Sequence, residues 1–416
     1  MELHNGRLFW GTTQDREFPV ARKEKSGYYD VIIVGGGMSG ALCAYTLSAA
    51  GMRIAVLDKG VMGAGSTLAN TGLIQFSNDI MLHKLMEQIG EERAVRFYKL
   101  CVQAVDHLEE AAYRLEQSSD FIRRSSLYYA SGEADAPLLR KEYETLVRHG
   151  FQAEYWTRNS LMDKLPFVKP AALVTRGDAE LNPYRFIRGL VRLLNRRGVH
   201  LFEQAEVTGL QDRATHLELQ TSIGKLRGAH VVFTTGYSNP PGLREAGVEL
   251  NRSYAIATRP VEGLSKAWKD RMLIWETRRP YFYMRTTTDD RIIAGGLDED
   301  KPDAPHDPRL IEDRAQRLKE EVESLFPMLT ITVDFAWGAV FGESRDNLPF
   351  IGRHPARDRV YYLLGYGGNG TVYSMLGSEV LRDLILGRPN RDAEMLRLDR
   401  MAPDSFGSYR LFSSGH

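Results

Sequence analysis

The sequence predicts an α/β chain, α+β overall, in which a Rossmann-like parallel sheet is joined to a second domain built on an antiparallel sheet. Near the N-terminus, short β-branched runs flank a helix-forming segment, and a glycine-rich turn follows the first run. In the second half, strands alternate apolar and polar residues, as one-sided antiparallel sheets do. With 416 residues, the chain is also too long for one ordinary core.

The elements follow in order. Residues 1–26 are mixed and turn-rich, and we expect them to be loosely attached. Residues 30–34 (DVIIV) predict a buried strand, residues 39–50 a helix that stops at Gly51, and residues 53–58 (RIAVLD) a second strand. These three elements predict a βαβ unit.

Later segments indicate both architectures. The expected elements are two or three helices in 79–116, a strand at 127–130, an amphipathic helix at 184–198, a resumed parallel sheet in 199–236, antiparallel strands in 252–335, a last buried strand at 359–364 and a helix from about 371 to 386. The two sheets therefore interleave along the chain.

Composition excludes several classes of function. The 54 Lys and Arg balance 54 Asp and Glu, which gives no electrostatic argument for nucleic acid or an anionic membrane. Two cysteines and the absence of a long apolar run predict a cytoplasmic protein with no integral membrane segment. The 10 histidines never fall at helical ligand spacing, so we expect no metal.

The glycine-rich turn predicts a dinucleotide site. Residues 35–40 (GGGMSG) satisfy GxGxxG between a strand and a helix, and Asp58 ends the second strand. Gly35 permits the tight turn, Gly37 leaves room for a pyrophosphate, and Gly40 lets the helix approach the strand. The helix start offers N–H groups to phosphate, while Asp58 suits a ribose hydroxyl. NAD and FAD both fit this turn, and a glycine turn without ligand is the alternative.

Two further segments favour FAD. Residues 63–72 (GAGSTLANTG) form a loop of small and hydroxyl side chains, and residues 365–371 (GYGGNGT) open a helix after a buried strand. A second helix start aimed inward would place positive dipole where a reduced flavin holds negative charge. The alternative is an ordinary turn with a helix cap.

These segments resemble the D-amino acid oxidase-like FAD-dependent oxidoreductases, which include glycine and sarcosine oxidases and γ-glutamylputrescine oxidoreductase. The resemblance spans about residues 29–390. The matching segments are 35–40, Asp58, 66–72, 204–208 (QAEVT), Thr235 with Gly236, 349–352 (PFIG) and 365–370.

The resemblance implies a discontinuous FAD-binding domain of residues 1–85, 178–245 and 336–395, a substrate domain of 86–177 and 246–335, and a tail of 396–416. It also implies dissociable, non-covalent FAD, because neither Cys43 nor Cys101 falls at a tethering position and Leu68 and Ala69 fill the loop where a tethering His occurs. The implied FAD-binding residues are Gly35, Gly37, Met38, Ser39, Gly40, Asp58, Lys59, Ser66, Thr67, Asn70, Thr71, Gly72, Val207, Thr235, Gly236, Gly367, Gly368, Asn369, Gly370 and Thr371.

On the substrate side, Tyr283 and Arg285 resemble the strand that presents a carboxylate-binding Arg in amino-acid oxidases, and Asn369 completes the expected catalytic set. The alternative makes Arg285 an ordinary surface charge. Phe341 stands where amino-acid oxidases often have an Arg-Pro pair. The segment with Phe341 resembles the amine-oxidising members more closely. The aromatic candidates for the cavity wall are Tyr254, Tyr281, Trp337 and Tyr366.

The resulting hypothesis is an enzyme that oxidises the C–N bond of a small-molecule amine or amino acid to an imine by hydride transfer to flavin N5. Oxygen or a quinone would reoxidise the flavin. An NAD-dependent dehydrogenase and a non-catalytic FAD-binding protein remain the alternatives.

Overall fold

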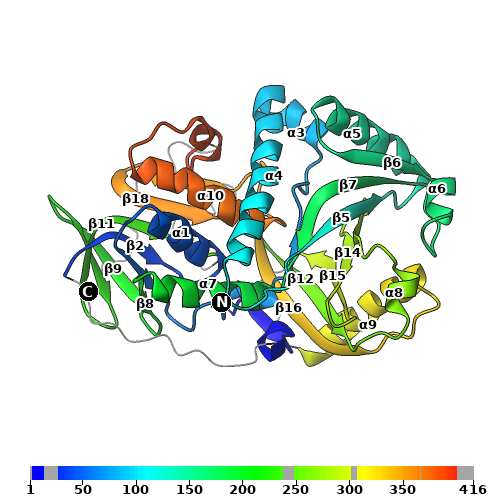
Figure 1. Ribbon diagram of the computed structural model, residues 1–416, viewed down its shortest axis with the longest axis horizontal. Helices are drawn as coiled ribbons and strands as arrows, with labels where there is room; N and C mark the ends of the chain where they lie inside the picture. Colours follow the sequence, from blue (N-terminus) through cyan, green and yellow to red (C-terminus); the bar gives the residue numbers. More distant parts are fainter. Residues whose placement is uncertain (1, 14–26, 238–247, 301–306, 366, 401–416) are drawn as a thin grey trace.

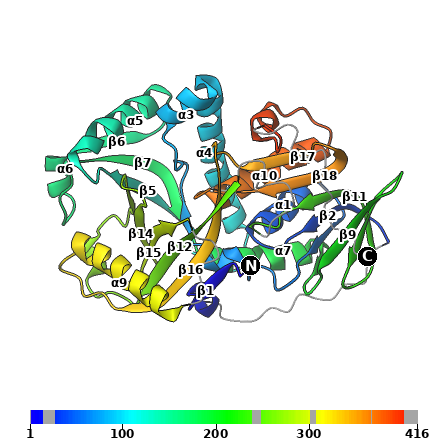
Figure 2. The ribbon, with the colours of Figure 1, turned by 180° about the vertical axis from the view of Figure 1, so that it is seen from behind.

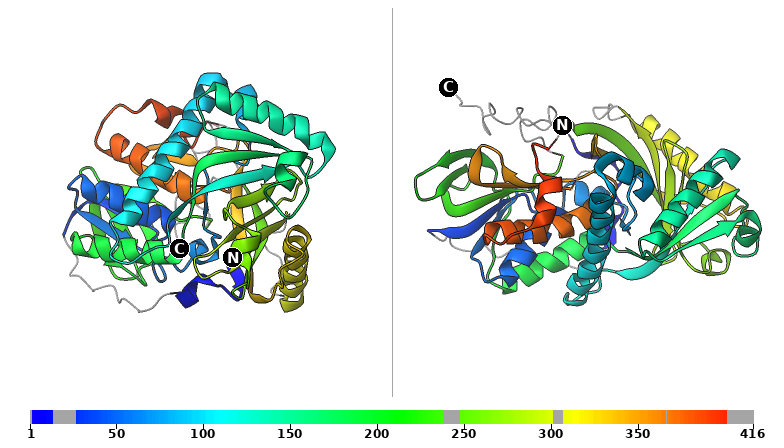
Figure 3. Two further views of the ribbon diagram at one scale, coloured as in Figure 1. Left: turned by 45° about the vertical axis from the view of Figure 1, so that its right-hand side comes forward. Right: turned by 90° about the horizontal axis from the view of Figure 1, so that it is seen from above.

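The computed structural model describes residues 2–13, 27–237, 248–300, 307–365 and 367–400. The two sheets lie in separate halves of the molecule, and the long helix α4 (Glu91–Tyr113) lies between them (Figure 1). The halves are also distinct when the molecule is seen from above (Figure 3). This two-part architecture confirms the predicted fold class.

The first half contains an eight-stranded sheet whose centre is parallel. Its main path runs β17 (Phe350–His354), β18 (Arg357–Leu364), β11 (Leu226–Phe233), β2 (Tyr29–Val34), β3 (Ile54–Leu57) and β8 (His200–Phe202). From β18 to β8 each neighbouring pair is parallel, whereas β17 is antiparallel to β18. An antiparallel ribbon of β9 (Val207–Asp212) and β10 (Leu217–Thr221) extends from β11.

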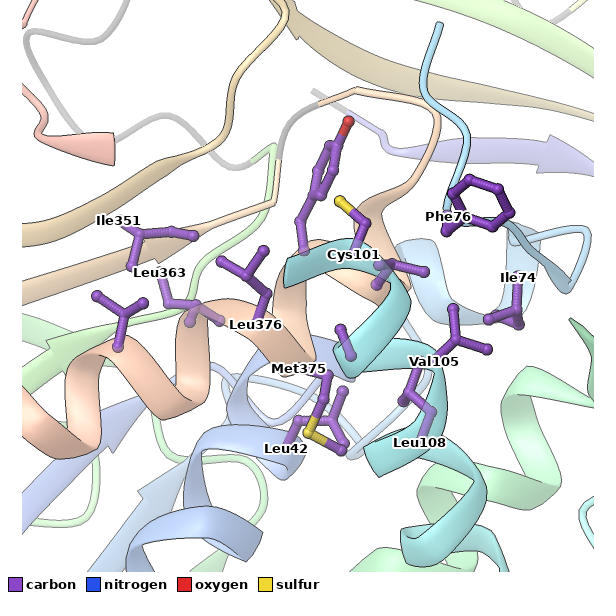
Figure 4. Close-up of a cluster of buried hydrophobic side chains, with 14 of the residues drawn as sticks. Leu42, Ile74, Phe76, Cys101, Val105, Leu108, Ile351, Leu363, Met375 and Leu376 are labelled. Carbon is purple, nitrogen blue, oxygen red and sulfur yellow. The ribbon is translucent and has the colours of Figure 1, made fainter. Parts of the chain in front are cut away.

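Helices α1 (Met38–Ala49), α7 (Pro183–Arg196) and α10 (Gly370–Ile385) accompany this sheet. Figure 4 shows apolar side chains of α1, α4 and α10 meeting in one cluster that includes Leu42, Val105 and Met375. Helix α10 approaches the sheet closely at Gly377, where a Cβ would meet the side chains of Leu363 and Ile351. A glycine is therefore required there.

The second half contains a ten-stranded sheet, seen from behind in Figure 2. Its path runs β1 (His4–Gly6), β16 (Val333–Ser344), β12 (Val248–Thr258), β15 (Ile292–Glu299), β14 (Phe282–Thr286), β13 (Leu273–Glu276), β5 (Ile122–Tyr129), β7 (Ala171–Glu180) and β4 (Leu73–Ile74), with β6 (Ala153–Thr157) paired to β7. Apart from the parallel pair β13–β5, neighbouring strands in the described residues are antiparallel.

The remaining elements are short helices and helices that cover the second sheet. They are η1 (Trp10–Thr13), α2 (Ser66–Ala69), α3 (Leu82–Ile89), η2 (Glu133–Asp135), α5 (Ala136–Arg148), α6 (Arg158–Met162), α8 (Leu264–Ala267), α9 (Pro308–Leu325) and η3 (Arg391–Leu396). None of the helices within the described ranges combines the length and the apolar character that a membrane span needs.

The N-terminal segment differs from the prediction of loose attachment. Strand β1 pairs with β16, and Trp10 is 2% exposed because it packs with Phe9 against Phe335. Two buried aromatic rings provide enough apolar burial to hold a short segment in place. Residues 14–26 lie outside the described part of the chain.

Sheet membership also departs from the predicted domain boundaries. Strands β1 and β4, and β16 from residue 336 onward, lie in the antiparallel sheet, although these residues were assigned to the FAD-binding domain. Helix α4 packs on α10, although it was assigned to the substrate domain. Strand β16 pairs with β12 over its whole length, which a motif-based boundary at 336 cannot anticipate.

Candidate cofactor and substrate site

A cavity of about 600 Å³ is lined by residues of both sheets. On the parallel-sheet side it begins where strands end, at Val34 and Leu364, the last residues of β2 and β18, and at Asp58 and Thr234, which directly follow β3 and β11. Ligands of open parallel sheets bind at these carboxyl ends. On the other side it is lined by residues of the antiparallel sheet, including Tyr283.

The three glycines that define the GxGxxG turn have the distinct roles that the spacing predicts. Gly35 has φ +112°, and a Cβ there would lie 2.5 Å from the carbonyl oxygen of Thr234. A Cβ on Gly40 would overlap the carbonyl oxygen of Gly35. Gly37 instead lines the cavity, where the nearest atom to an added Cβ is Thr67 Oγ1 at 3.5 Å. The start of α1 is therefore open to a ligand.

Asp58 is fixed at the end of β3. Its Oδ2 accepts the N–H of Gly36 and its Oδ1 accepts the N–H of Gly60, each at 2.7 Å. Burial raises the pKa of the Asp58 carboxyl, and the two backbone hydrogen bonds oppose this effect. Lys59 and Val207 also line the cavity.

Two cavity-lining hydroxyl groups lack partners. Ser66 Oγ and Thr235 Oγ1 are buried and have no hydrogen-bond partner among the described residues, and both residues line the cavity. An unsatisfied buried hydroxyl costs free energy unless a bound molecule satisfies it. Together with the open start of α1, these hydroxyls fit a bound dinucleotide.

The C-terminal glycine segment meets the N-terminal loop at this cavity. Asn70 Nδ2 donates to Thr371 Oγ1 at 3.3 Å, and the hydroxyls of Ser39 and Ser374 lie 2.8 Å apart. Gly35 and Gly368 line the same cavity, so two distant parts of the sequence converge on one site.

The start of α10 is only partly available to a ligand. The N–H of Gly367 donates to the carbonyl of Gly342 at 2.7 Å, and that of Gly368 to Asp79 Oδ2 at 2.8 Å. The helix begins at Gly370, and within the described chain no side chain caps it. Any N–H groups offered to a flavin therefore belong to residues after Gly368.

Most of the predicted cofactor residues line the cavity, and two do not. Gly40 and Gly72 are not part of the lining, and a Cβ on Gly72 would meet the guanidinium of Arg285 and overlap the carbonyl of Leu181. Those that line it are Gly35, Gly37, Met38, Ser39, Asp58, Lys59, Ser66, Thr67, Asn70, Thr71, Val207, Thr235, Gly236, Gly367, Gly368, Asn369, Gly370 and Thr371.

Arg285 fits neither predicted role. It is 2% exposed and does not line the cavity. Its three nitrogens donate to the carbonyls of Thr71, Thr286 and Leu181, and Glu180 lies 3.9 Å away. Burial lowers the pKa of its guanidinium to about 10, so it stays charged at neutral pH. We therefore correct the prediction of a carboxylate ligand, and the surface alternative, to a buried residue that holds the loop backbone.

Three buried donors together hold three consecutive carbonyls of this loop. Trp337 Nε1 donates to Ala69 at 3.0 Å, Trp10 Nε1 to Asn70 at 2.6 Å, and Arg285 Nε to Thr71 at 2.8 Å. These bonds fix the backbone that presents Asn70 and Thr71 to the cavity.

Asn369 is similarly committed to the protein. Its Nδ2 donates to the carbonyl of Ser77 at 2.5 Å and to Asn78 Oδ1 at 3.2 Å. Its side-chain donors therefore join the start of α10 to residues 77–78, which is a positioning role, whereas Asn369 was predicted to be catalytic and to contact the flavin.

Two tyrosines form part of the substrate-side wall. Tyr281 and Tyr283 line the cavity with ring centroids 5.7 Å apart. Burial raises the pKa of Tyr283 to about 12 and that of Tyr281 well above its usual range, so both phenols are neutral near pH 7. Tyr254 and Trp337 are buried and do not line the cavity, and Tyr366 lies outside the described residues.

Several residues that line the cavity belong to no sequence motif and were not predicted. Asp79 precedes a helix, Asp298 lies near the end of β15, and Trp275 lies in β13, none of them in a motif. Only the pairing of distant strands brings them to the cavity, although an acid near a strand end is a weak indication.

Neither cysteine is placed to react with a cofactor. Cys43 in α1 and Cys101 in α4 are buried outside the cavity lining, and burial raises the pKa of each thiol to about 12. Among the described residues, no histidine lines the cavity and no cluster of ligating side chains could hold a metal.

The parallel sheet with its glycine turn, the second helix start and the antiparallel wall define a dinucleotide-binding oxidoreductase fold. The sequence profile of the family described as FAD dependent oxidoreductase matches residues 30–384. The chain belongs to this family of FAD-dependent enzymes.

Relatives and solved structures agree with this membership. Glycine oxidase of Bacillus licheniformis is 24% identical over 371 residues, covering 87% of this chain and 94% of that protein. Gamma-glutamylputrescine oxidoreductase of Escherichia coli is 21% identical over 391 residues, covering 92% and 89%. The crystal structure of glycine oxidase from Geobacillus kaustophilus superimposes with a TM-score of 0.75 at 20% identity, covering 92% of this chain and 100% of that one. The structural similarity extends over the whole fold.

Proposed function

We propose that the protein oxidises the C–N bond of a small-molecule amine or amino acid, with FAD bound non-covalently in the cavity. The observation that carries the proposal is the meeting of two helix starts, α1 and α10, at a cavity whose other wall holds Tyr281 and Tyr283. One side suits the cofactor and the other accommodates a small organic substrate.

FAD, when bound, supplies a two-electron oxidant that takes a hydride equivalent from the carbon bearing the nitrogen, while a proton leaves the nitrogen. The amine thereby becomes an imine, and water converts the imine to a carbonyl compound and an amine or ammonia. Oxygen or a quinone is the proposed final acceptor. The chain's own contribution is positioning, through the loop at Asn70 and Thr71 and the tyrosine wall.

Anaerobic reduction tests this proposal. The purified holoenzyme is mixed without oxygen with glycine, sarcosine, other amino acids and aliphatic amines, and the visible absorbance of the oxidised flavin is followed. Bleaching by at least one amine is expected. A yellow protein that no amine bleaches would support the non-catalytic alternative, and a colourless protein that binds NADH would support a nicotinamide-dependent dehydrogenase.

A further inference from the structure

Trp275 is a buried hydrogen-bond donor on the substrate-side wall of the cavity. It lies in β13 opposite Tyr283 of β14, so the two side chains share one face of the sheet. Trp275 is 7% exposed, and its Nε1 has no hydrogen-bond partner among the described residues. Its ring stacks on that of Tyr128 with the centroids 3.7 Å apart, which fixes the indole. Because an indole N–H can only donate, the group that satisfies it must be an acceptor.

Ser77 provides a second unpartnered group in the same part of the wall. Its Oγ is buried without a hydrogen-bond partner in the described part of the chain, and the residue lines the cavity. The carbonyl of Ser77 accepts from Asn369 Nδ2 at 2.5 Å, which fixes the backbone here. Ser77 and Trp275 also line a side cavity of about 10 Å³, which has room for one water at most. An organic group that reaches both side chains must therefore come from the main cavity.

Neighbouring polar side chains of the lining already have partners within the protein. Gln75 Nε2 donates to a serine hydroxyl at 3.1 Å, and Asn78 Nδ2 donates to a backbone carbonyl at 3.3 Å. The side chain of Tyr283 is hydrogen-bonded to Thr71 and Ser253. The indole N–H is thus a donor that the protein positions and leaves for another molecule.

The charges along the cavity favour an uncharged acceptor. Asp79 and Asp298 both line it, and within the described ranges Lys59 is the one Lys, Arg or His that does so. Lys59 follows Asp58 at the end of β3, on the parallel-sheet side. A ligand carboxylate at the indole would lose water without gaining a lining cation, which is costly, whereas a carbonyl oxygen carries no such cost.

Arg279 does not supply the missing cation. It is exposed and lies outside the lining. Its Nη2 donates to the backbone carbonyl of Asp79 at 3.3 Å, and its Nη1 to those of Glu276 and Arg278, each at 3.4 Å. The guanidinium carbon lies 4.7 Å from the ring centroid of Tyr281. The arginine is therefore occupied by the protein at the edge of this wall.

We infer that the substrate is an amine that also carries an uncharged carbonyl group, as in an amide, and that Trp275 Nε1 donates to this carbonyl oxygen with Ser77 Oγ as a second contact. The inference rests on the proposed amine oxidation and names the substrate class of the same site. Trp275 is then a specificity-determining residue, because its hydrogen bond holds the far end of the substrate while the amine end faces the flavin.

Matched compounds test the substrate class. Each amide is compared with the carboxylate and the branched alkylamine of the same length and shape: glycinamide with glycine and isobutylamine, β-alaninamide with β-alanine and isopentylamine, and γ-aminobutyramide with γ-aminobutyrate and isohexylamine. The rate of anaerobic flavin bleaching in the holoenzyme is measured against the concentration of free-base amine. At the best chain length, we expect the amide to exceed the alkylamine by roughly threefold to tenfold for one hydrogen bond, and the carboxylate to be the least efficient.

Two tryptophan variants assign the effect to one indole. Trp275→Phe keeps a ring that can stack on Tyr128 and removes the N–H, so the preference for the amide should fall by roughly threefold to tenfold. Trp268→Phe is the matched control and should keep the wild-type preference. Trp268 is 0% exposed, stacks on Phe326 and has an Nε1 without a partner among the described residues, but it does not line the cavity. Ser77→Ala should lower the preference by a smaller factor than Trp275→Phe.

A binding measurement gives a readout that does not depend on turnover. Butanamide and butanoate have no amine to oxidise, so their Kd is obtained at equilibrium from the change in the flavin spectrum. Butanamide should bind the wild type more tightly than butanoate does, and Trp275→Phe should raise the butanamide Kd by roughly threefold to tenfold. Flavin content and thermal unfolding confirm that each variant is folded and loaded.

The outcomes separate the inference from the proposed function. If a carboxylate or an alkylamine is the most efficient at every chain length, or if butanoate binds more tightly than butanamide, the substrate class is wrong while amine oxidation stands. An amide preference that survives in Trp275→Phe would overturn the assignment and leave the indole to a bound water. If no amine bleaches the flavin but butanamide binds as expected, the proposed function alone fails.

Discussion

Arg285 donates its Nε–H to the carbonyl oxygen of Thr71 at 2.8 Å, across a separation of 214 residues in the sequence. The same guanidinium also bonds the carbonyl of Leu181, and its carbon lies 5.1 Å from the ring centroid of Trp10. A strand of the antiparallel sheet thus holds, through a single cation, the loop that presents Asn70 and Thr71 to the cavity. The contact gives this buried arginine a structural role away from the cavity lining.

Replacing Arg285 by Met should therefore weaken the fold and the cofactor site together. The loss of a buried, hydrogen-bonded cation is expected to cost on the order of 3 kcal/mol. Thermal unfolding and the ratio of flavin to protein absorbance measure both effects. Arg291→Met, at an arginine on the adjoining β14–β15 turn, is the control for stability alone. A stable, fully loaded Arg285→Met protein with only a raised KM would restore the carboxylate-binding role.

The unpartnered hydroxyls of Ser66 and Thr235 predict a selective effect on FAD. In Ser66→Ala and Thr235→Val, the FAD Kd should rise by roughly threefold to tenfold for each lost hydrogen bond, while the apoprotein keeps its stability. Ser119→Ala removes another buried, unpartnered hydroxyl that does not line the cavity. Fluorescence titration of the apoprotein should show an unchanged FAD Kd for that control.

The cofactor side of the site was largely predictable because its geometry is local. A local pattern of strand, turn and helix predicts each of these features: the turn at Gly35, the acidic residue Asp58 at the end of the second strand, and the helix start at Gly370. Most residues assigned from those patterns line the cavity. The βαβ unit and the antiparallel strands were predicted for the same reason, since each has its own periodicity.

The substrate side was not predictable in the same way. Asp298, Trp275 and Asp79 come to one wall only through pairing of strands and loops far apart in the sequence. The alternating residues around Arg285 indicated that the two faces of this strand differ in polarity. They did not indicate that the Arg285 side chain is buried against the carbonyls of Thr71 and Leu181. The burial of Trp10 likewise depends on β16, which no local pattern near the N-terminus reveals.

Denaturation in acid should release the flavin completely. Cys43 and Cys101 lie outside the cavity lining, and burial raises the pKa of both thiols, so neither is a nucleophile toward the cofactor. After precipitation with trichloroacetic acid, all flavin absorbance is expected in the supernatant and none in the washed pellet. Flavin fluorescence that stays with the pellet would show a covalent bond.

His354 in β17 should make stability depend on pH. It is 4% exposed, its Nδ1 accepts the N–H of Ala356 at 3.0 Å, and burial with the nearby Arg357 lowers its pKa from 6.5 to about 4. Above about pH 6.5 the ring is neutral in both states, so it contributes no pH dependence. As the pH falls from 6.5 toward 4, the unfolded chain takes up a proton that the folded chain does not, and stability is lost.

For a difference of this size the loss approaches about 3 kcal/mol at pH 4. Unfolding of the wild type and of His354→Asn by urea, at pH 8, 6 and 5, isolates the effect, because all other groups titrate in both proteins. The advantage of the wild type should shrink as the pH falls. A difference that stays constant with pH would show that His354 is protonated equally in both states.

Gly37 and Gly40 should respond differently to the same added methyl group. At Gly40 a Cβ overlaps the carbonyl of Gly35, so Gly40→Ala must displace α1 from β2 and is expected to give little folded protein. At Gly37 the nearest atom to a Cβ is Thr67 Oγ1 at 3.5 Å, which is an ordinary contact, and the methyl enters the cavity. Gly37→Ala should therefore fold with the Tm of the wild-type apoprotein but lose FAD affinity by tenfold or more, on the order of a steric cost of 1 to 3 kcal/mol. The Tm of the apoprotein and the FAD Kd from fluorescence titration separate the two variants. If Gly37→Ala and Gly40→Ala lowered the Tm and raised the Kd to the same extent, Gly40 would not serve packing alone, nor Gly37 the ligand alone.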